Sequence, residues 1–118
     1  MTGPIVFNGL LDAATDFDAL DWQPLHPGVD VVDLYPPVSD GARAALLRYQ
    51  PGATVPWHVH GGFEHILVLR GSQQDASGVY RAGTLVINLP GSTHQVSSEE
   101  GCIVLAVWQK QVQLLDAI

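Results

Sequence analysis

Residues 51–71 read PGATVPWHVHGGFEHILVLRG and hold three of the five histidines of the chain. Side chains two residues apart in an extended strand point to the same face, so His58 and His60 are expected to project side by side. Two glycines follow, and a tight reversal there would bring Glu64 back beside the two imidazoles. The stretch therefore predicts a metal-chelating arrangement carried by two β-strands.

Strand alternation separates the third histidine of this stretch from the other two. One face is expected to carry Glu64, Ile66 and Val68, and the opposite face His65, Leu67 and Leu69. If Glu64 points inward with the histidines, His65 points away. We therefore do not expect His65 to be a ligand.

His94 is the best candidate for a fourth ligand. It ends the turn LPGSTH (residues 89–94), which directly follows an apolar run. The remaining histidine, His26, lies between Pro24 and Pro27, and we expect it to be exposed in a loop.

Three neutral imidazoles and one carboxylate suit a divalent first-row metal such as zinc, iron, manganese, nickel or copper. They do not suit calcium or magnesium, which prefer oxygen ligands. Zinc bound by all four groups would be tetrahedral and closed, whereas iron, manganese or nickel would keep positions open for water or substrate. The alternative is that these histidines only fill a polar barrel interior.

The rest of the chain is divided by 12 glycines and 8 prolines into short apolar runs. The runs typical of strands are residues 29–35, 43–49, 65–70, 85–89 and 102–109. Turns are expected at residues 75–78 and 81–84. Successive short strands without a long helical pattern predict an all-β sandwich or barrel.

The N-terminal part departs from this pattern. Residues 12–20 carry a weak apolar stripe, which predicts a short helix. We expect residues 1–25 either to wrap around the outside of the barrel or to pair with a partner subunit.

Composition limits the classes of function. The chain has 118 residues, 47% hydrophobic and 14% charged, which is typical of one folded domain spanning residues 1–118. Its net charge is −7, and residues 1–42 hold seven aspartates but no lysine or arginine. This acidic balance disfavours nucleic-acid binding. It indicates a solvated surface or, alternatively, a surface for a basic partner.

The chain also lacks the usual signals for membrane insertion or export. No apolar run approaches the ~20 residues that span a bilayer, and no basic residue precedes the first apolar ones. We expect a cytoplasmic protein without a membrane partner. The single cysteine, Cys102, excludes an internal disulfide.

Two segments resemble the motifs of the cupin superfamily. Residues 52–71 fit the first motif at every spacing, as Gly52-x5-His58-x-His60-x3-Glu64-x6-Gly71. Residues 83–98 fit the second motif in spacing, as Gly83-x5-Leu89-x-Gly91-x2-His94-x3-Ser98. The pattern has proline where this chain has Leu89 and asparagine where it has Ser98. The resemblance implies a cupin barrel (a double-stranded β-helix or jelly roll) with one divalent metal ion held by His58, His60, Glu64 and His94.

Within the cupins, the sequence around both motifs is similar to that of the ChrR-type cupin-like domain. That branch implies zinc, while the ligand set itself leaves iron, manganese or nickel as alternatives. Its anti-sigma activity belongs to a separate N-terminal zinc module, and the short N-terminal region of this chain has no Cys/His cluster that resembles it. Sigma-factor inhibition therefore does not transfer.

The cupin resemblance also implies a conical pocket that ends at the metal. Candidate walls are Tyr49, Trp57, Phe63, Ile66, Ile87, Val104 and Trp108, with Arg48 as the alternative to Tyr49 on the opposite face of the same strand. An inward Arg48 would suit a carboxylate or similar anion. For each aromatic residue the alternative is core packing.

Three hypotheses for function remain. The first is a metal-dependent enzyme acting on a small organic acid or diketone, and the second is a non-catalytic zinc-binding sensory or regulatory module. The third is a structural protein with vestigial histidines. A homodimer is also expected, with the face of His65, Leu67 and Leu69 as its interface.

Overall fold

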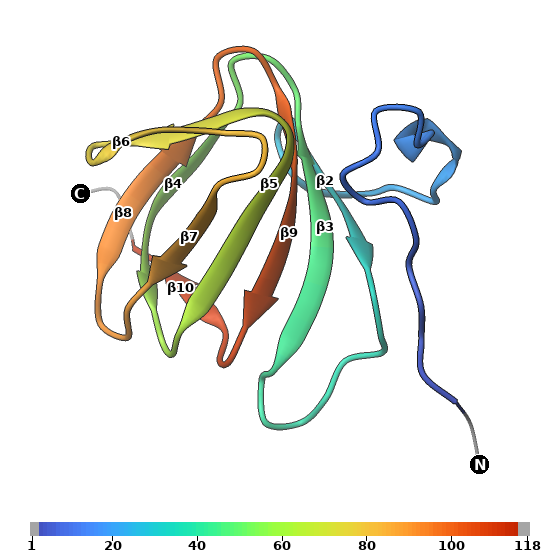
Figure 1. Cartoon of the computed structure of the whole chain (residues 1–118). Helices are drawn as coiled ribbons and strands as arrows, with labels where there is room; N and C mark the ends of the chain where they lie inside the picture. Colours follow the sequence, from blue (N-terminus) through green and yellow to red (C-terminus); the bar gives the residue numbers. More distant parts are fainter. Residues whose placement is uncertain (1–2, 116–118) are drawn as a thin grey trace.

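The computed structural model describes residues 3–115, which form ten strands and one short 3-10 helix (Figure 1). The helix is η1 (Phe17–Ala19). The strands are β1 (Gln23–His26), β2 (Val29–Asp33), β3 (Arg43–Tyr49), β4 (Thr54–His60), β5 (Glu64–Asp75), β6 (Gly78–Arg81), β7 (Leu85–Asn88), β8 (Thr93–Ser97), β9 (Cys102–Trp108) and β10 (Val112–Leu114). The all-β prediction is confirmed. None of the helices among the described residues is long and apolar enough to cross a membrane.

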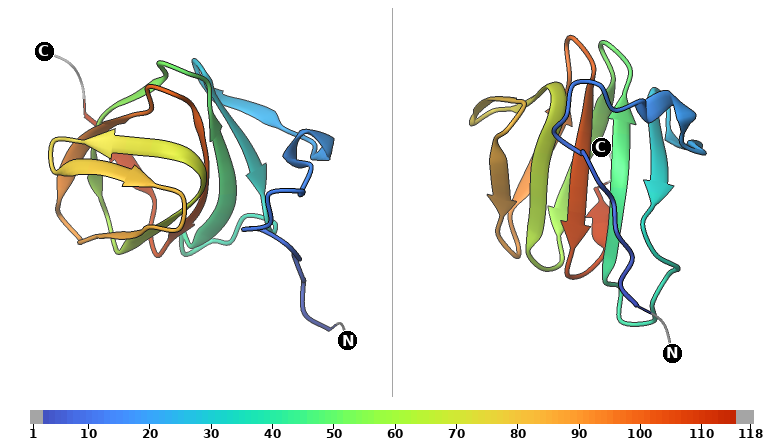
Figure 2. Two further views of the ribbon diagram at one scale, coloured as in Figure 1. Left: turned by 45° about the horizontal axis from the view of Figure 1, so that its top comes forward. Right: turned by 45° about the vertical axis from the view of Figure 1, so that its right-hand side comes forward.

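The strands form one curled antiparallel sheet in the order β1-β2-β3-β9-β5-β8-β4-β10, with β6 and β7 attached to β5. Strand β5 is the longest and belongs to both walls of the barrel, one containing β7 and β9 and the other containing β6 and β8. Its first part, residues 64–71, pairs with β7 and β9, whereas residues 72–75 pair with β6, and Gln74 also pairs with β8. An irregularity in the pairing between Val68 and Arg70 accompanies the bend. The left view of Figure 2 shows how the sheet curls around a common interior.

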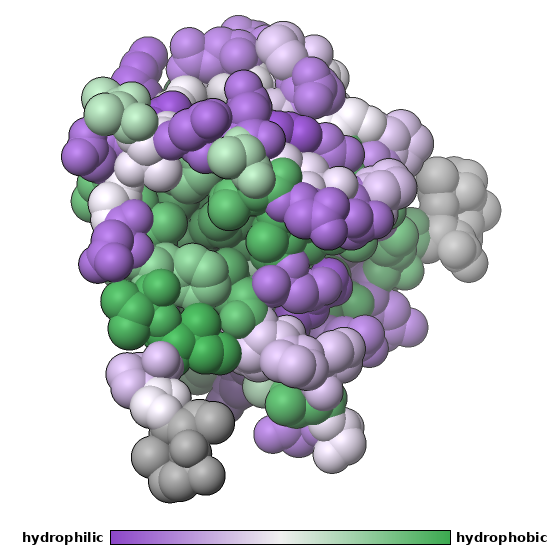
Figure 3. Space-filling view, turned by 90° about the vertical axis from the view of Figure 1, so that its right-hand side faces the viewer, coloured by the Kyte–Doolittle hydropathy of each residue, from purple (hydrophilic) through white to green (hydrophobic). Residues whose placement is uncertain are grey.

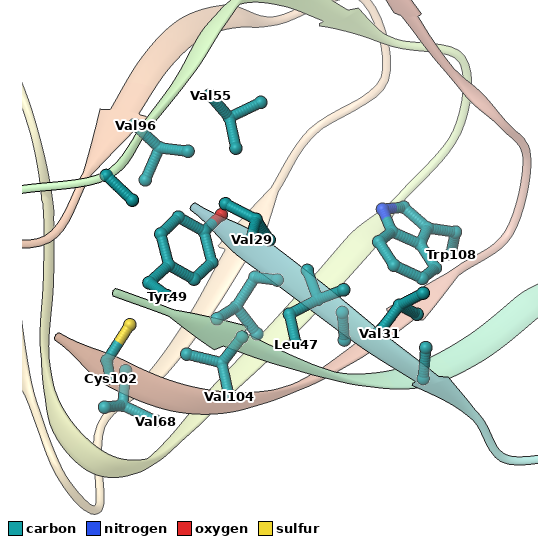
Figure 4. Close-up of a cluster of buried hydrophobic side chains, with 14 residues drawn as sticks. Val29, Val31, Leu47, Tyr49, Val55, Val68, Val96, Cys102, Val104 and Trp108 are labelled. Carbon is teal, nitrogen blue, oxygen red and sulfur yellow. The ribbon is translucent and has the colours of Figure 1, made fainter. Parts of the chain in front are cut away.

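The interior is filled by the inward-facing residues of β3, β5 and β9. Along β9, Val104 and Ala106 are fully buried, and their neighbours on the other face are partly exposed. Along β5, Glu64, Ile66 and Val68 are buried, as alternation predicts. Figure 4 shows the apolar cluster that results, which also contains Tyr49 and Trp108.

The N-terminal segment, residues 3–22, covers the outer face of the barrel. Phe17 is 3% exposed because it packs against Leu46 and Leu69 in a second apolar cluster. The right view of Figure 2 shows this segment running along the outside of the strands. The first alternative is therefore confirmed for residues 3–22, whereas residues 23–25 belong to β1, and residues 1 and 2 lie outside the described residues. Figure 3 shows that hydrophobic side chains still form a band on the surface of this side.

One arginine holds the segment in place and explains why the predicted helix is wrong. The guanidinium of Arg70 donates hydrogen bonds to the backbone carbonyls of Asp12, Ala13 and Thr15, at 2.8–3.2 Å, and lies over the ring of Phe17. These carbonyls face Arg70, and residues 12–16 form turns instead of a helix. Only residues 17–19 are helical.

Candidate metal centre

Strands β4 and β8 bring three histidines together. The register pairs His58 with His94, and His60 lies two residues further along β4 on the same face. The ring centroids are 4.6–5.1 Å apart, and one nitrogen from each ring lies within 4.8 Å of the others. Both β4 histidines are buried, and His94 is half-buried. Residues far apart in the sequence therefore form one compact nitrogen cluster.

The second nitrogen of each ring is already engaged. The Nδ1 atoms lie 2.8 Å from Pro56 O for His58, 2.9 Å from Ser92 O for His60, and 3.0 Å from Asp75 Oδ2 for His94. Since these oxygens are acceptors, each Nδ1 carries its hydrogen and the lone pair is left on Nε2. The Nε2 of His60 is buried without a hydrogen-bond partner. The three imidazoles could therefore hold a divalent ion at their Nε2 atoms.

Glu64 lies beside this cluster at the start of β5. Its Oε1 is 3.2 Å from His60 Nε2, although the two atoms are not aligned for a hydrogen bond. Asn88 Nδ2 donates to Oε1 at 2.9 Å, and Trp108 Nε1 donates to Oε2. Glu64 is therefore held firmly next to the histidines but outside the nitrogen cluster. Its role as a fourth ligand stays a prediction.

Burial and neighbouring charges shift the pKa values in this site. Burial lowers the pKa of His58, and the nearby charges of His94 and His60 lower it further. Burial alone would raise the pKa of Glu64, but the nearby charge of His60 and the hydrogen bonds donated by Trp108 and Asn88 outweigh it, and the pKa is lowered. Burial alone would lower the pKa of His60, but Glu64 beside it raises this pKa overall. The site therefore keeps an anionic carboxylate beside an imidazole, which favours a cation.

Asp75 is a functional candidate that sequence reasoning missed. It is the last residue of β5 and pairs with Gly78 of β6, so the predicted turn at residues 75–78 is confirmed. Besides its contact with His94, its carboxylate accepts hydrogen bonds from the Tyr80 hydroxyl at 2.9 Å and the Ser77 backbone N–H at 2.9 Å. Burial acts to raise the pKa of Asp75, but the contact with His94 and these donors lower it overall. A carboxylate held in this way fixes the orientation of a metal-binding imidazole.

Of the other two histidines, His65 agrees with the sequence prediction and His26 does not. His65 is exposed on the outer face of β5, as alternation predicts. His26, expected in an exposed loop, instead ends β1, pairs with Val29 and lines the interior cavity. The flanking prolines do not prevent this, because β1 is an edge strand of the sheet.

A cavity of about 140 Å³ extends from the histidines through the barrel. Its walls are mostly apolar, and the expected wall residues Tyr49, Ile66 and Trp108 do line it. The other lining residues are Leu25, His26, Val29, Gly41, Arg43, Leu47, Val55, His58, Glu64, Gln73, His94, Val96, Gln111 and Val112.

Five expected wall residues lie outside this cavity, which corrects the sequence prediction. Trp57, Phe63 and Ile87 are 42–50% exposed on the surface. Arg48 lies on the outer face of β3, where it pairs with Asp18 and Asp30 and stacks on the ring of Trp22 at 4.5 Å. It therefore cannot hold an anion in the cavity. Val104 is fully buried in the core and does not line the cavity.

The family comparison agrees with this geometry. A family model described as the ChrR cupin-like domain matches residues 11–113, which is most of the chain. The chain belongs to the ChrR cupin-like domain family. The cupin fold predicted from the two motifs is therefore confirmed. No curated protein matches this cupin.

Solved structures with the same fold include proteins with different roles. A structure of SigE in complex with the anti-sigma ChrR from Rhodobacter sphaeroides is 28% identical with a TM-score of 0.73, and the match covers 88% of this cupin and 61% of that chain. An RmlC-like cupin from Ralstonia eutropha is 24% identical with a TM-score of 0.75, covering 86% and 70% of the two chains. An acetylacetone dioxygenase from Acinetobacter johnsonii is 13% identical with a TM-score of 0.75, covering 88% and 80%. The last two show the fold alone.

Proposed function

We propose that this cupin binds one divalent metal ion and uses it to bind a small organic acid or diketone in the barrel. Zinc is the first choice for the metal, ahead of iron, manganese or nickel. His58, His60 and His94 supply the ion's nitrogen ligands, and Glu64 supplies a carboxylate beside them. The observation that supports this proposal is the occupied Nδ1 atom on each ring, which leaves three Nε2 lone pairs grouped together. A bound divalent ion supplies a Lewis acid that polarises a carbonyl or carboxylate oxygen.

The cavity limits the size of the organic molecule. A dry apolar cavity of ~150 Å³ in another protein holds benzene, which has six non-hydrogen atoms. The cavity here is of similar size, about 140 Å³, and its walls are mostly apolar. A ligand with a compact hydrocarbon body and an oxygen-bearing head fits this space. Organic acids and diketones of five to seven carbons belong to this class.

A second candidate is a non-catalytic zinc-binding sensory or regulatory module. It is favoured by the likeness to the structure that contains the anti-sigma ChrR, at 28% identity. In that case His58, His60, His94 and Glu64 would fill all four positions of a tetrahedral zinc ion. X-ray absorption spectroscopy distinguishes the two: a fifth, exchangeable oxygen ligand supports the small-molecule proposal, and a closed four-coordinate ion supports the second candidate.

Elemental analysis of protein purified without added metal tests the metal centre. We expect one equivalent of a divalent metal per chain, zinc first. H58A and H94A should each lose it, because each removes one of three clustered nitrogens. H65A is the matched control, because His65 is exposed and faces away from the cluster. Metal content that is the same in all four proteins would contradict the proposal.

A further inference from the structure

Two buried polar side chains line the apolar part of the cavity. Tyr49 is 4% exposed and Gln73 is 5% exposed, and both line the cavity. The surrounding wall is formed by Val29, Val55 and Val96, which belong to the apolar cluster. Figure 4 shows the hydroxyl of Tyr49 directed away from Cys102, its neighbour on β9. Burying polar groups among valines costs free energy unless they bind a partner.

This polar pair is separated from the histidines along the strands. On β8, Val96 lies two residues from His94 on the same face, which corresponds to about 7 Å of strand. Val96 pairs with β4 at Val55, and His94 pairs with β4 at His58. The cavity therefore runs from a histidine end to a tyrosine end. The spacing of about 7 Å between His94 and Val96, which belongs to the same apolar cluster as Tyr49, corresponds to an extended chain of about five carbon atoms.

The tyrosine end is polar but neutral. Burial raises the pKa of Tyr49 far above its usual range, so the phenol stays protonated and can donate. Gln73 acts in the opposite direction on the pKa of this hydroxyl, and burial outweighs it. A carboxamide carries two N–H donors and a carbonyl acceptor, so the pair retains capacity for a further hydrogen bond.

The cationic groups of the cavity lie elsewhere. Arg43 is the one arginine or lysine among the described lining residues, and its guanidinium is already paired with Asp33 at 2.7 Å and lies near the Trp108 ring. His26 lines the cavity from the end of the edge strand β1 and is only half-buried. A second carboxylate beside Tyr49 would therefore be buried without a strong counter-charge.

We propose that Tyr49 and Gln73 form a second recognition point, which selects a ligand with a neutral hydroxyl or carbonyl oxygen about five carbons from its metal-binding oxygen. The inference rests on the proposed function, because the other end of the ligand binds the metal. The ligand class is a short hydroxy or oxo acid, in preference to a simple fatty acid or a dicarboxylate. Tyr49 and Gln73 determine specificity and take no part in holding the ion.

Calorimetric titration of the zinc-loaded protein with three acids of matched length tests this selection. Pentanoate, 5-hydroxypentanoate and glutarate share one carboxylate and differ at the far end, which is apolar, neutral polar and charged. We expect 5-hydroxypentanoate to bind about five- to tenfold more tightly than pentanoate, the gain from one net hydrogen bond. Glutarate should bind most weakly, because its second charge would be buried.

Two variants connect the preference to the named residues. Y49F and Q73M each remove polar atoms with little change of volume, so in each variant the preference for 5-hydroxypentanoate over pentanoate should disappear. Y35F is the matched control, because Tyr35 lies in the segment after β2 and does not line the cavity. Zinc content and circular dichroism check that each variant is folded, and either variant alone is sufficient for the test.

The outcomes separate this inference from the proposed function. Equal binding of pentanoate and 5-hydroxypentanoate, tightest binding of glutarate, or a preference that persists in Y49F and Q73M overturns the recognition point but leaves the small-molecule function standing. If the zinc-loaded protein binds none of the three acids, the small-molecule function is contradicted and the inference fails with it.

Discussion

Asp75 shows how one residue outside the nitrogen cluster can decide the quality of the metal site. D75N keeps the size of the side chain but removes the carboxylate that accepts the Nδ1 hydrogen of His94. We expect a 10- to 100-fold loss of metal affinity, the usual effect of removing such a partner. Competition with a chromogenic chelator measures it.

The matched variant for Asp75 is Y80F, which removes one donor to the same carboxylate. Its effect on metal affinity should have the same direction and be smaller, because Ser77 still holds Asp75. Unchanged affinity in D75N would show that the carboxylate does not support the site.

Cys102 should be chemically silent in the folded protein. Burial raises its thiol pKa to about 11. The reactive thiolate is the deprotonated form, and its population falls tenfold for each pH unit below the pKa, so at pH 8 it is on the order of one in a thousand. We expect little reaction with a disulfide reagent at pH 8 in buffer and one reacting thiol per chain in denaturant. Rapid labelling of the native protein would contradict this.

At the scale of elements, the close pairing of β5 and β9 depends on Gly71. Its φ is +68°, and a Cβ there would lie 2.0 Å from the carbonyl oxygen of Gly101. G71A should therefore destabilise the fold strongly. Gly52 also has a positive φ, +85°, but a Cβ there meets nothing within 4 Å. G52A should cost only about 1–2 kcal/mol of backbone strain. Urea unfolding compares the two, and equal losses would contradict the role of the contact.

The strands that could be predicted were those with strong apolar runs. The structure has a strand at residues 43–49 as expected, while the run at 29–35 ends at Asp33 and the run at 65–70 is part of the longer β5. Outside the predicted runs lie β1, β6, β8 and β10, which are short and hold polar residues or proline. Such strands depend on pairing with neighbours more than on their own propensity.

The site was predictable where local alternation decides it and not where register does. His58, His60 and the outward His65 follow from a period of two residues. The same period puts Trp57, next to His58, on the other face of the strand, so the prediction that Trp57 is a pocket wall was wrong. By contrast, Asp75 reaches His94 and Trp108 reaches Glu64 only through pairings between distant strands. No spacing in the sequence reports those contacts.

At the scale of the whole molecule, part of the outer face that we expected a partner subunit to cover is covered by this chain itself. Leu69 is buried by the N-terminal segment of its own chain and is not available to a partner. His65 remains exposed and pairs across the sheet with Ile87 on one side and Val107 on the other. These two apolar residues are 49% and 37% exposed. The homodimer stays a prediction, and this row is its expected interface.

Light scattering on I87D tests that prediction. We expect the unmodified protein to have twice the 12.7 kDa mass of one chain and I87D to be monomeric, because a buried carboxylate opposes the contact. V79D is the control, since Val79 is 51% exposed on β6, away from this row. A monomeric unmodified protein, or a dimer that persists in I87D, would contradict the assignment.

The double membership of β5 has a consequence for how the barrel opens. Because β5 pairs with β6, β7, β8 and β9, neither wall can come apart without breaking hydrogen bonds to the same strand. Its amide hydrogens in Ile66–Val68 should therefore exchange with deuterated water only through global unfolding, whereas those of β1 and β10, at the two edges, exchange through local fraying. Glu64 begins this strand and Asp75 ends it, so both carboxylates that contact the histidines are carried by one strand that global unfolding alone releases.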